Sequence, residues 1–183
     1  LVENCTITGN SAQYGGGVRL RLAGSTVRNC LITGNSASAE GGGLEAYVFG
    51  VVENCTICSN SADTAGGGIQ DAGSASGIYR NTIIYFNSAP SQPNHKTTAS
   101  VSYSCTTPAV AGDGNITNDP LVVNSAAGNF HLRWMSPCVN TGTNQPWMTD
   151  AKDLDGNDRI YDDIVDMGAY EHMPPPGSTF TFY

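Results

Sequence analysis

The first half of the chain repeats one pattern of apolar and polar residues about every 25 positions, with no helical period inside a copy. Three apolar columns run through the copies. Each column can supply one inward side chain to a short strand, so the pattern predicts a coil of three strands that stacks on similar coils. The columns are Val2, Val27, Val52 and Tyr79; Ile7, Ile32, Ile57 and Ile84; and Val18, Leu44 and Ile69.

Asparagines and glycines recur in the same register. Asparagine tolerates left-handed backbone and its amide can bond to the same amide one coil away, so an asparagine column predicts a stacked turn. Glycine triplets at residues 15–17, 41–43 and 66–68 predict another corner, where no Cβ is tolerated. The two expected asparagine ladders are Asn4, Asn29, Asn54 and Asn81, and Asn10, Asn35, Asn60 and Asn87.

These features predict an all-β fold, a parallel β-helix (solenoid) with one coil per repeat. We expect about six to seven coils over residues 1–172, of which residues 1–87 are regular and residues 101–172 are irregular. Residues 88–100 contain two prolines and are expected to be a loop that leaves the coil. Residues 173–183 are expected to be a proline-rich spacer and an extended tail strand. A leucine-rich repeat has a similar period, but its L-x-x-L-x-L pattern is absent.

A charged column tests the stacking. Glu3, Arg28, Glu53 and Arg80 alternate in sign from copy to copy. Opposite charges on neighbouring strands attract and like charges repel, so the alternation is expected if each residue lies directly above the next. Such exposed pairs contribute only tenths of a kcal/mol each and therefore set the register more than the stability.

Composition narrows the range of functions. The 183 residues include 8 basic and 16 acidic ones, which argues against a nucleic acid or an anionic membrane as partner. No apolar run approaches the roughly 18 to 20 residues of a membrane span. Six cysteines, 22 glycines and few lysines are typical of an extracellular protein.

Two stretches carry a resemblance to a known family. The repeats, with "NCTITGNSA" from Asn4 and their glycine triplets, resemble the right-handed parallel β-helix repeats of bacterial surface and secreted proteins. The segment from Asn118 and the "DLDGNDRIYDDIVDMGAYE" of residues 153–171 resemble the C-terminal end of such proteins, often called a choice-of-anchor Q domain. The resemblance implies a right-handed winding and an exported location, and it implies no particular activity.

The cysteines divide into two groups. Cys5, Cys30 and Cys55 share a column and are expected to be buried thiols, because parallel strands in register rarely present disulfide torsions. Cys55 and Cys58 form a C-x-x-C, but within one strand they face opposite sides, which argues against zinc or redox chemistry. Proteins similar to this one often have cysteines at both remaining places, so the resemblance implies a disulfide between Cys105 and Cys138.

One acidic turn is a candidate cation site. Asp153, Asp155, Asn157 and Asp158 surround a glycine in the manner of the opening of a calcium loop. The bidentate glutamate at the twelfth position is missing, and Asp-Gly-Asn is also a plain tight turn, so both interpretations stay open. Calcium is the one cofactor considered. We expect no enzymatic activity, because no motif in the sequence matches the paired carboxylates and bases of polysaccharide hydrolases and lyases.

The two ends suggest a function. The first coil begins at Leu1 with no capping helix before it, and an open coil exposes unpaired backbone groups and core. Residues 178–183 alternate threonine with aromatic residues, which is typical of a strand that joins a sheet edge. We expect an extracellular structural subunit that assembles with itself, head to tail, into a filament. The alternatives are a stalk of a larger adhesin whose outer face binds glycan and a polysaccharide-cleaving enzyme. The expected subunit contacts are Phe180, Phe182 and Tyr183 on one copy, and Leu1, Val2 and Ile7 on the next.

Overall fold

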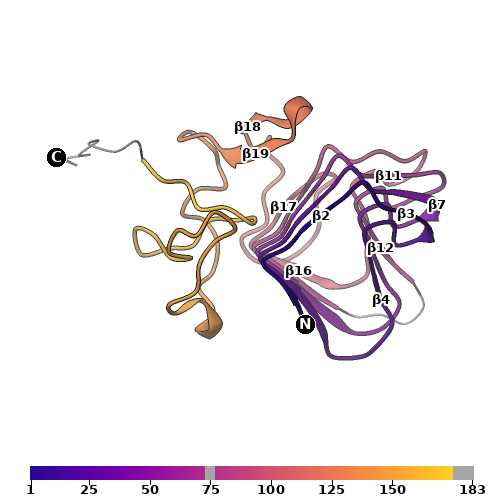
Figure 1. Cartoon of the computed structure of the whole chain (residues 1–183), viewed down its shortest axis with the longest axis horizontal. Coiled ribbons are helices and arrows are strands. Elements are labelled where there is room, and N and C mark those ends of the chain that lie inside the picture. The colour runs from indigo at the N-terminus through magenta and orange to yellow at the C-terminus, as the bar shows by residue number, and fades with distance from the viewer. Residues whose placement is uncertain (73–76, 175–183) are drawn as a thin grey trace.

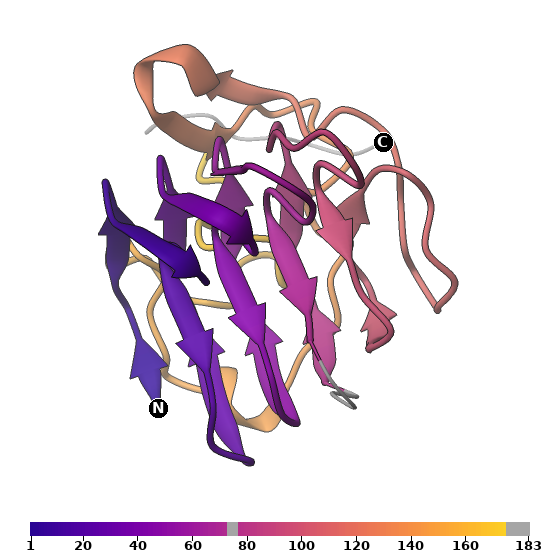
Figure 2. The same cartoon turned by 90° about the vertical axis from the view of Figure 1, so that its right-hand side faces the viewer.

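The computed structural model describes residues 1–72 and 77–174. These residues form an all-β parallel solenoid of about four turns, and the described part of the chain contains no α-helix. Figure 2 shows successive rungs side by side, from the indigo N-terminal rung to the magenta and pink ones. The predicted parallel β-helix is confirmed at this level.

Two five-stranded parallel sheets hold the first two strands of each rung. Their registers pair Val2 with Val27 and Ile7 with Ile32, so two of the three predicted apolar columns lie in line along the stack. The first sheet contains β1 (Val2–Glu3), β5 (Ser25–Arg28), β9 (Gly50–Glu53), β13 (Ile78–Arg80) and β16 (Ser100–Ser102). The second contains β2 (Thr6–Thr8), β6 (Leu31–Thr33), β10 (Thr56–Cys58), β14 (Ile83–Tyr85) and β17 (Cys105–Thr106).

The remaining strands show that a rung has four strands where the sequence predicts three. The additional strand pairs Ala12 with Ala37 and Ala37 with Ala62, and such small residues leave no column of large apolar side chains to detect. Its sheet contains β3 (Ser11–Tyr14), β7 (Ser36–Glu40) and β11 (Ser61–Ala62). The last sheet contains β4 (Val18–Leu20), β8 (Leu44–Ala46), β12 (Ile69–Asp71) and β15 (His95–Lys96).

The predicted core and glycine corner are both present. Val27, Ile32, Leu44 and their neighbours in the later rungs are buried inside the solenoid, whereas those in the first rung are only partly buried. At the corner, a Cβ on Gly42 would lie 2.2 Å from the backbone oxygen of Ser61 and 2.4 Å from that of Gly67 on the adjoining rung. Backbone atoms at that distance leave no room for any other residue.

The expected loop at residues 88–100 is only partly outside the coil. Within it, His95–Lys96 form β15, which pairs with Ile69 and Gln70 of β12. The chain therefore returns to the stack after a shortened excursion, and Ser100 already belongs to β16.

The last rung is closed by the chain itself. Residues 107–116 cross its free edge: Tyr103 donates to the Asp113 oxygen at 2.7 Å, Thr106 donates to the Ile116 oxygen at 3.0 Å, and Asn115 donates to the Val101 oxygen at 2.9 Å. These contacts satisfy backbone groups of β16 and β17 that a further rung would otherwise take.

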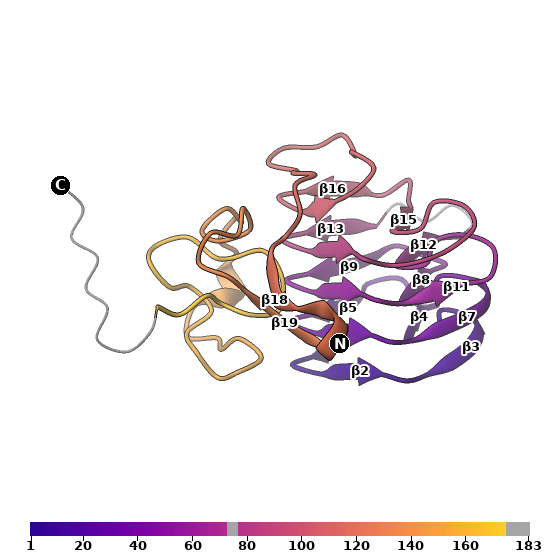
Figure 3. The ribbon, with the colours of Figure 1, turned by 90° about the horizontal axis from the view of Figure 1, so that it is seen from above.

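The described residues after 117 add no further rung and lie along the side of the solenoid, which Figures 1 and 3 show in orange and yellow. They form an antiparallel hairpin of β18 (Val122–Asn124) and β19 (Asn129–Leu132), whose strands are joined by the short 3-10 helix η1 (Ser125–Ala127). A second 3-10 helix, η2 (Pro146–Met148), follows later in the segment. Their apolar residues cover the outer face of the second sheet in a second core: Leu31, Cys58, Ile83, Cys105, Val122, Phe130, Leu132, Cys138, Met167, Ala169 and Tyr170. The irregular coils expected over residues 101–172 thus continue the stack only through β16 and β17.

Candidate functional site

The first rung presents four open strand edges. β1, β2, β3 and β4 each lie at the outer end of their sheets, and no strand in the described part of the chain pairs with their other edge. At the other end of the stack, residues 113–116 bind the outer edges of β16 and β17, whereas no strand in the described part of the chain pairs with the outer edge of β15. Unpaired N–H and C=O groups on four adjacent edges form a template for another β-strand.

The same rung exposes apolar surface. Val2, Ile7 and Val18 are only partly buried, whereas their neighbours one rung later, such as Ile32, are fully buried. Leu1 and Leu22 are 75% and 76% exposed and are the two most exposed large apolar residues described. Covering this face would remove apolar surface from water, which is favourable.

The predicted ladder from Asn10 to Asn87 is confirmed and has a direction. Asn10 donates its backbone N–H at 3.0 Å and its Nδ2 at 3.1 Å to the Oδ1 of Asn35, and the pattern repeats along the stack. Asn87 makes the same two bonds to Asn94, a fifth member that sequence reasoning missed because the shortened excursion breaks the spacing. At the open rung, Asn10 Oδ1 has no donor among the described residues, so it could accept the same bonds from an incoming asparagine.

The charged column lies in register as predicted, but it is less exposed than expected, because Glu53 is buried and Arg28 lies over the Trp147 ring. Glu3, Arg28, Glu53 and Arg80 lie in register, with ion pairs of 2.6 Å between Arg28 and Glu3 and 3.2 Å between Arg80 and Glu53. A strand that adds to β1 would therefore meet the free side of Glu3 and would favour a basic residue there.

The ladder that starts at Asn4 is confirmed in backbone and only partly in its amide bonds. All four asparagines have left-handed backbone, with φ between 48° and 54°. Amide-to-amide bonds join Asn29 to Asn4 and Asn81 to Asn54. The Nδ2 groups of Asn29, Asn54 and Asn81 also donate to backbone oxygens of the C-terminal segment: to Lys152 at 2.7 Å, Asp166 at 3.3 Å and Thr143 at 2.9 Å, respectively. This column is therefore the surface on which residues 143–166 dock.

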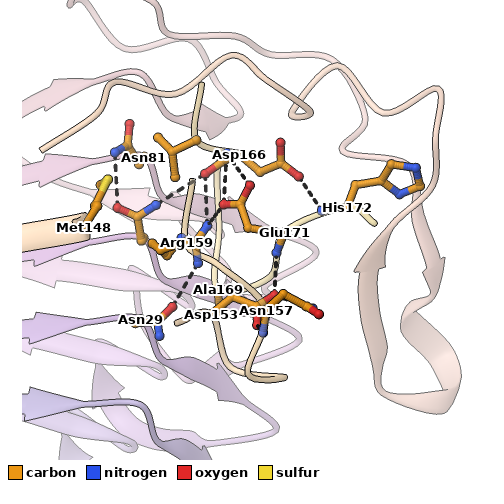
Figure 4. A network of polar contacts seen from close by, with 12 residues as sticks. Asn29, Asn81, Met148, Asp153, Asn157, Arg159, Asp166, Ala169, Glu171 and His172 are labelled. Carbon is orange, nitrogen blue, oxygen red and sulfur yellow. Dashed lines mark hydrogen bonds and ion pairs between the residues drawn. The ribbon is translucent and has the colours of Figure 1, made fainter. Parts of the chain in front are cut away.

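A buried ionic centre, drawn in Figure 4, holds this docking in place. Arg159 is fully buried, and its Nη2 pairs with Glu171 at 2.5 Å and also donates to the backbone oxygen of Asp166 at 3.3 Å. Its Nη1 donates to the Asn29 Oδ1 at 2.9 Å. The Asp166 carboxylate accepts backbone N–H groups of Asn140 and His172. Burial raises the pKa of Asp166 and raises that of Glu171 to about 8, although the charge of Arg159 opposes both. Sequence reasoning quoted this stretch only as a family motif and missed its role.

The acidic turn is a tight turn in the structure. Asp153 is buried and uses its carboxylate to accept the backbone N–H groups of Asp155, Asn157 and Glu171. Asp155 pairs with His131 at 2.6 Å and Asp158 pairs with Lys152, so the carboxylates turn toward different partners. No group of three or more His, Cys, Asp or Glu side chains in residues 1–72 and 77–174 is arranged to hold a metal ion. The hydrogen bonds to Asp153 are those of a tight turn, and calcium binding here stays a prediction.

Two of the three cysteines in the expected buried column are buried, whereas Cys5 in the first rung is only partly buried. Cys30 and Cys55 are fully buried thiols of the inner core, and Cys58 lies on the opposite face, in the second core. Burial raises the pKa of Cys58 to about 12. Cys105 and Cys138 lie together in the second core as free thiols, and contact with the Cys138 thiol is the main cause that raises the pKa of Cys105. The predicted disulfide joins two thiols that the fold brings into contact, and the bond itself stays a prediction.

We expect an oxidant such as dissolved oxygen to convert this pair into a disulfide, taking two electrons and two protons from the two thiols. Protein purified without reductant, denatured and alkylated should then show two fewer reactive thiols than the six cysteines present, by intact mass. Peptide mapping should assign the bridge to Cys105 and Cys138. Six alkylated cysteines would contradict the prediction.

The expected tail contacts Phe180, Phe182 and Tyr183 lie outside the described residues. Among the residues described, no helix has the length and apolar character needed to cross a membrane. No family model matches this chain, and the searches of curated proteins and of solved structures returned no match either. The resemblance to bacterial surface proteins is therefore supported by the parallel β-solenoid fold alone.

Proposed function

We propose that this protein is an extracellular structural subunit that assembles with itself head to tail. The observation that carries the proposal is the first rung, where four strand edges, partly exposed core residues and the Asn10 ladder group have no partner among the described residues. At the opposite end, residues 113–116 occupy the outer edges of β16 and β17, which disfavours the stacking of another rung there. A strand from another part of a neighbouring copy is the simpler way to cover the open rung.

The tail has the sequence of such a strand. Residues 179–181 read Thr-Phe-Thr, and β2 reads Thr6-Ile7-Thr8 with the threonines exposed and the isoleucine turned to the core. In the same register, Phe180 would enter the column of Ile7 and cover the exposed side of the inner core. Because donor and acceptor surfaces differ, the contact does not close on itself and produces a filament.

The handedness of the coil and the location of the protein belong to the same proposal. A right-handed coil is favoured because parallel strands in one sheet are joined by right-handed crossovers in about 98% of cases. The stack has about four turns, fewer than the six to seven expected, because the described residues after 117 dock along the side of the solenoid and add no rung. The extracellular location is supported by the cysteine and glycine content. A stalk of a larger adhesin is the second candidate, in which further coils cover the first rung.

The proposal is tested with four proteins: the intact chain, a chain lacking residues 178–183, Ile7→Lys and Thr8→Lys. Lysine at residue 7 places a charge on the inward side of the open edge and should prevent strand addition. Lysine at residue 8 adds the same charge to the same strand on its exposed side. We expect filaments by negative-stain electron microscopy for the intact chain and Thr8→Lys, and monomers for the other two.

Two results would overturn the proposal. Monomers of the intact chain would leave the stalk as the better candidate. Filaments of the chain that lacks residues 178–183 would show that assembly does not need the tail. Light scattering after gel filtration gives the masses, and circular dichroism of Ile7→Lys shows whether that chain is folded.

A further inference from the structure

A hollow beside the hairpin of β18 and β19 has the composition of a ligand site. Its volume is about 450 Å³, and it is an open depression of the surface and not an enclosed cavity. It lies between the hairpin and the end of β14, and no other part of the described chain fills it. Its lining combines the apolar Phe86, Leu121 and Val123 with the polar Asp119, Asn124 and Arg133.

Each of the three polar side chains is fixed by the hairpin and keeps one group free. Asp119 accepts the backbone N–H of Leu121 at 2.8 Å through one carboxylate oxygen. Asn124 accepts the N–H of Ala127 at 3.1 Å through Oδ1, which leaves its NH2 group. Arg133 donates to the backbone oxygens of Val122 and Val123 at 3.2 and 2.7 Å, which leaves Nη1. The hollow therefore offers one charged acceptor and two donors that are already ordered, which lowers the entropic cost of binding.

The apolar side of the hollow is exposed to solvent. Phe86, Leu121 and Val123 are 36%, 39% and 40% exposed, and the Phe86 ring is held edge-on against Tyr85 with ring centroids 4.9 Å apart. Phe86 has left-handed backbone, with φ of 58°, which is uncommon for an aromatic residue and directs the end of β14 toward the hairpin. Apolar residues of this exposure, beside and on the hairpin, are available to a ligand.

We propose that this hollow binds a neutral carbohydrate. A pyranose ring has an apolar C–H face that can lie on Phe86 and hydroxyl groups around its edge that both donate and accept. Those hydroxyls match the free Asp119 oxygen and the free Asn124 and Arg133 donors. A phosphate or an acidic sugar is disfavoured because the Asp119 carboxylate lies in the same hollow and the chain carries a net charge of −8. The site is independent of the open first rung.

The test is a titration of 15N-labelled protein with maltotriose, cellotriose, xylotriose and chitotriose, followed by 1H–15N correlation spectra. At least one trisaccharide is expected to shift the amides of Leu121, Val123 and Ser125. Asp119→Asn keeps the oxygen that caps Leu121 and removes the charged acceptor, so it should weaken binding about tenfold or more. Asp163→Asn makes the same change at an exposed aspartate that does not line the hollow, and it should leave binding unchanged.

Phe86→Leu keeps an apolar side chain and removes the aromatic face, so it should also weaken binding. Spectra of the free variants show whether each is folded. The assignment is overturned if no trisaccharide shifts these amides, if Asp119→Asn and Asp163→Asn bind equally well, or if the peptide tri-alanine produces the same shifts.

Discussion

Replacing Gly42 by alanine is expected to prevent stable folding of the solenoid. The added Cβ would lie 2.2 and 2.4 Å from the backbone oxygens of Ser61 and Gly67, which belong to the adjoining rung and are held by its ladder of hydrogen bonds. Since neither oxygen can retreat without opening the corner, the loss in free energy of unfolding should exceed about 3 kcal/mol. Urea denaturation followed by circular dichroism measures it.

Gly9→Ala is the matched control for this prediction. Gly9 has left-handed backbone, with φ of 69°, and a Cβ there would meet nothing within 4 Å. Its substitution costs only the backbone strain of about 1 kcal/mol. Equal losses for the two variants would show that close approach between rungs does not determine stability at the glycine corner.

Replacing Arg159 by methionine is expected to detach the C-terminal segment from the solenoid. Glu171 would remain buried without its cation, and Asn29 Oδ1 would lose its donor. Removing one partner of a buried ion pair costs about 3 to 5 kcal/mol. In hydrogen exchange, the amides of Gly168 and Ala169 should lose protection, whereas that of Leu31, which bonds to the first rung, should keep it.

The double variant Arg159→Met with Glu171→Leu distinguishes the effect of leaving a buried charge unpaired from the effect of lost packing. It removes both charges together, so it should be more stable than Arg159→Met alone. Lys152→Met breaks the exposed pair with Asp158 and should change stability by less than about 1 kcal/mol. A C-terminal segment that keeps its protection in Arg159→Met would contradict the role given to this centre.

Sequence reasoning was most successful where one residue type recurs at one place in every coil. The apolar columns through Val27 and Ile32, the ladder through Asn35 and the charges of Glu3 and Arg28 all lie in register as predicted. It was weaker where a rung departs from the consensus, as at β15, and where the repeated residue is as small as Ala37. At the acidic turn, only coordinates could distinguish a carboxylate that accepts backbone N–H groups from one free to bind a cation.

The sequence by itself determined the parallel solenoid. A single coil cannot bury its core alone and is stabilised by similar coils stacked on it, and every repeat carries the apolar columns that this stacking requires. The tertiary structure alone decided the course of the chain after β17. The contacts of this segment join residues far apart in the sequence, such as Arg159 with Asn29 and Ala169 with Thr56. These pairs do not follow the repeat period, so the sequence pattern does not predict them. Docking across the rungs buries a second core on one sheet and leaves the first rung as the open end of the described molecule.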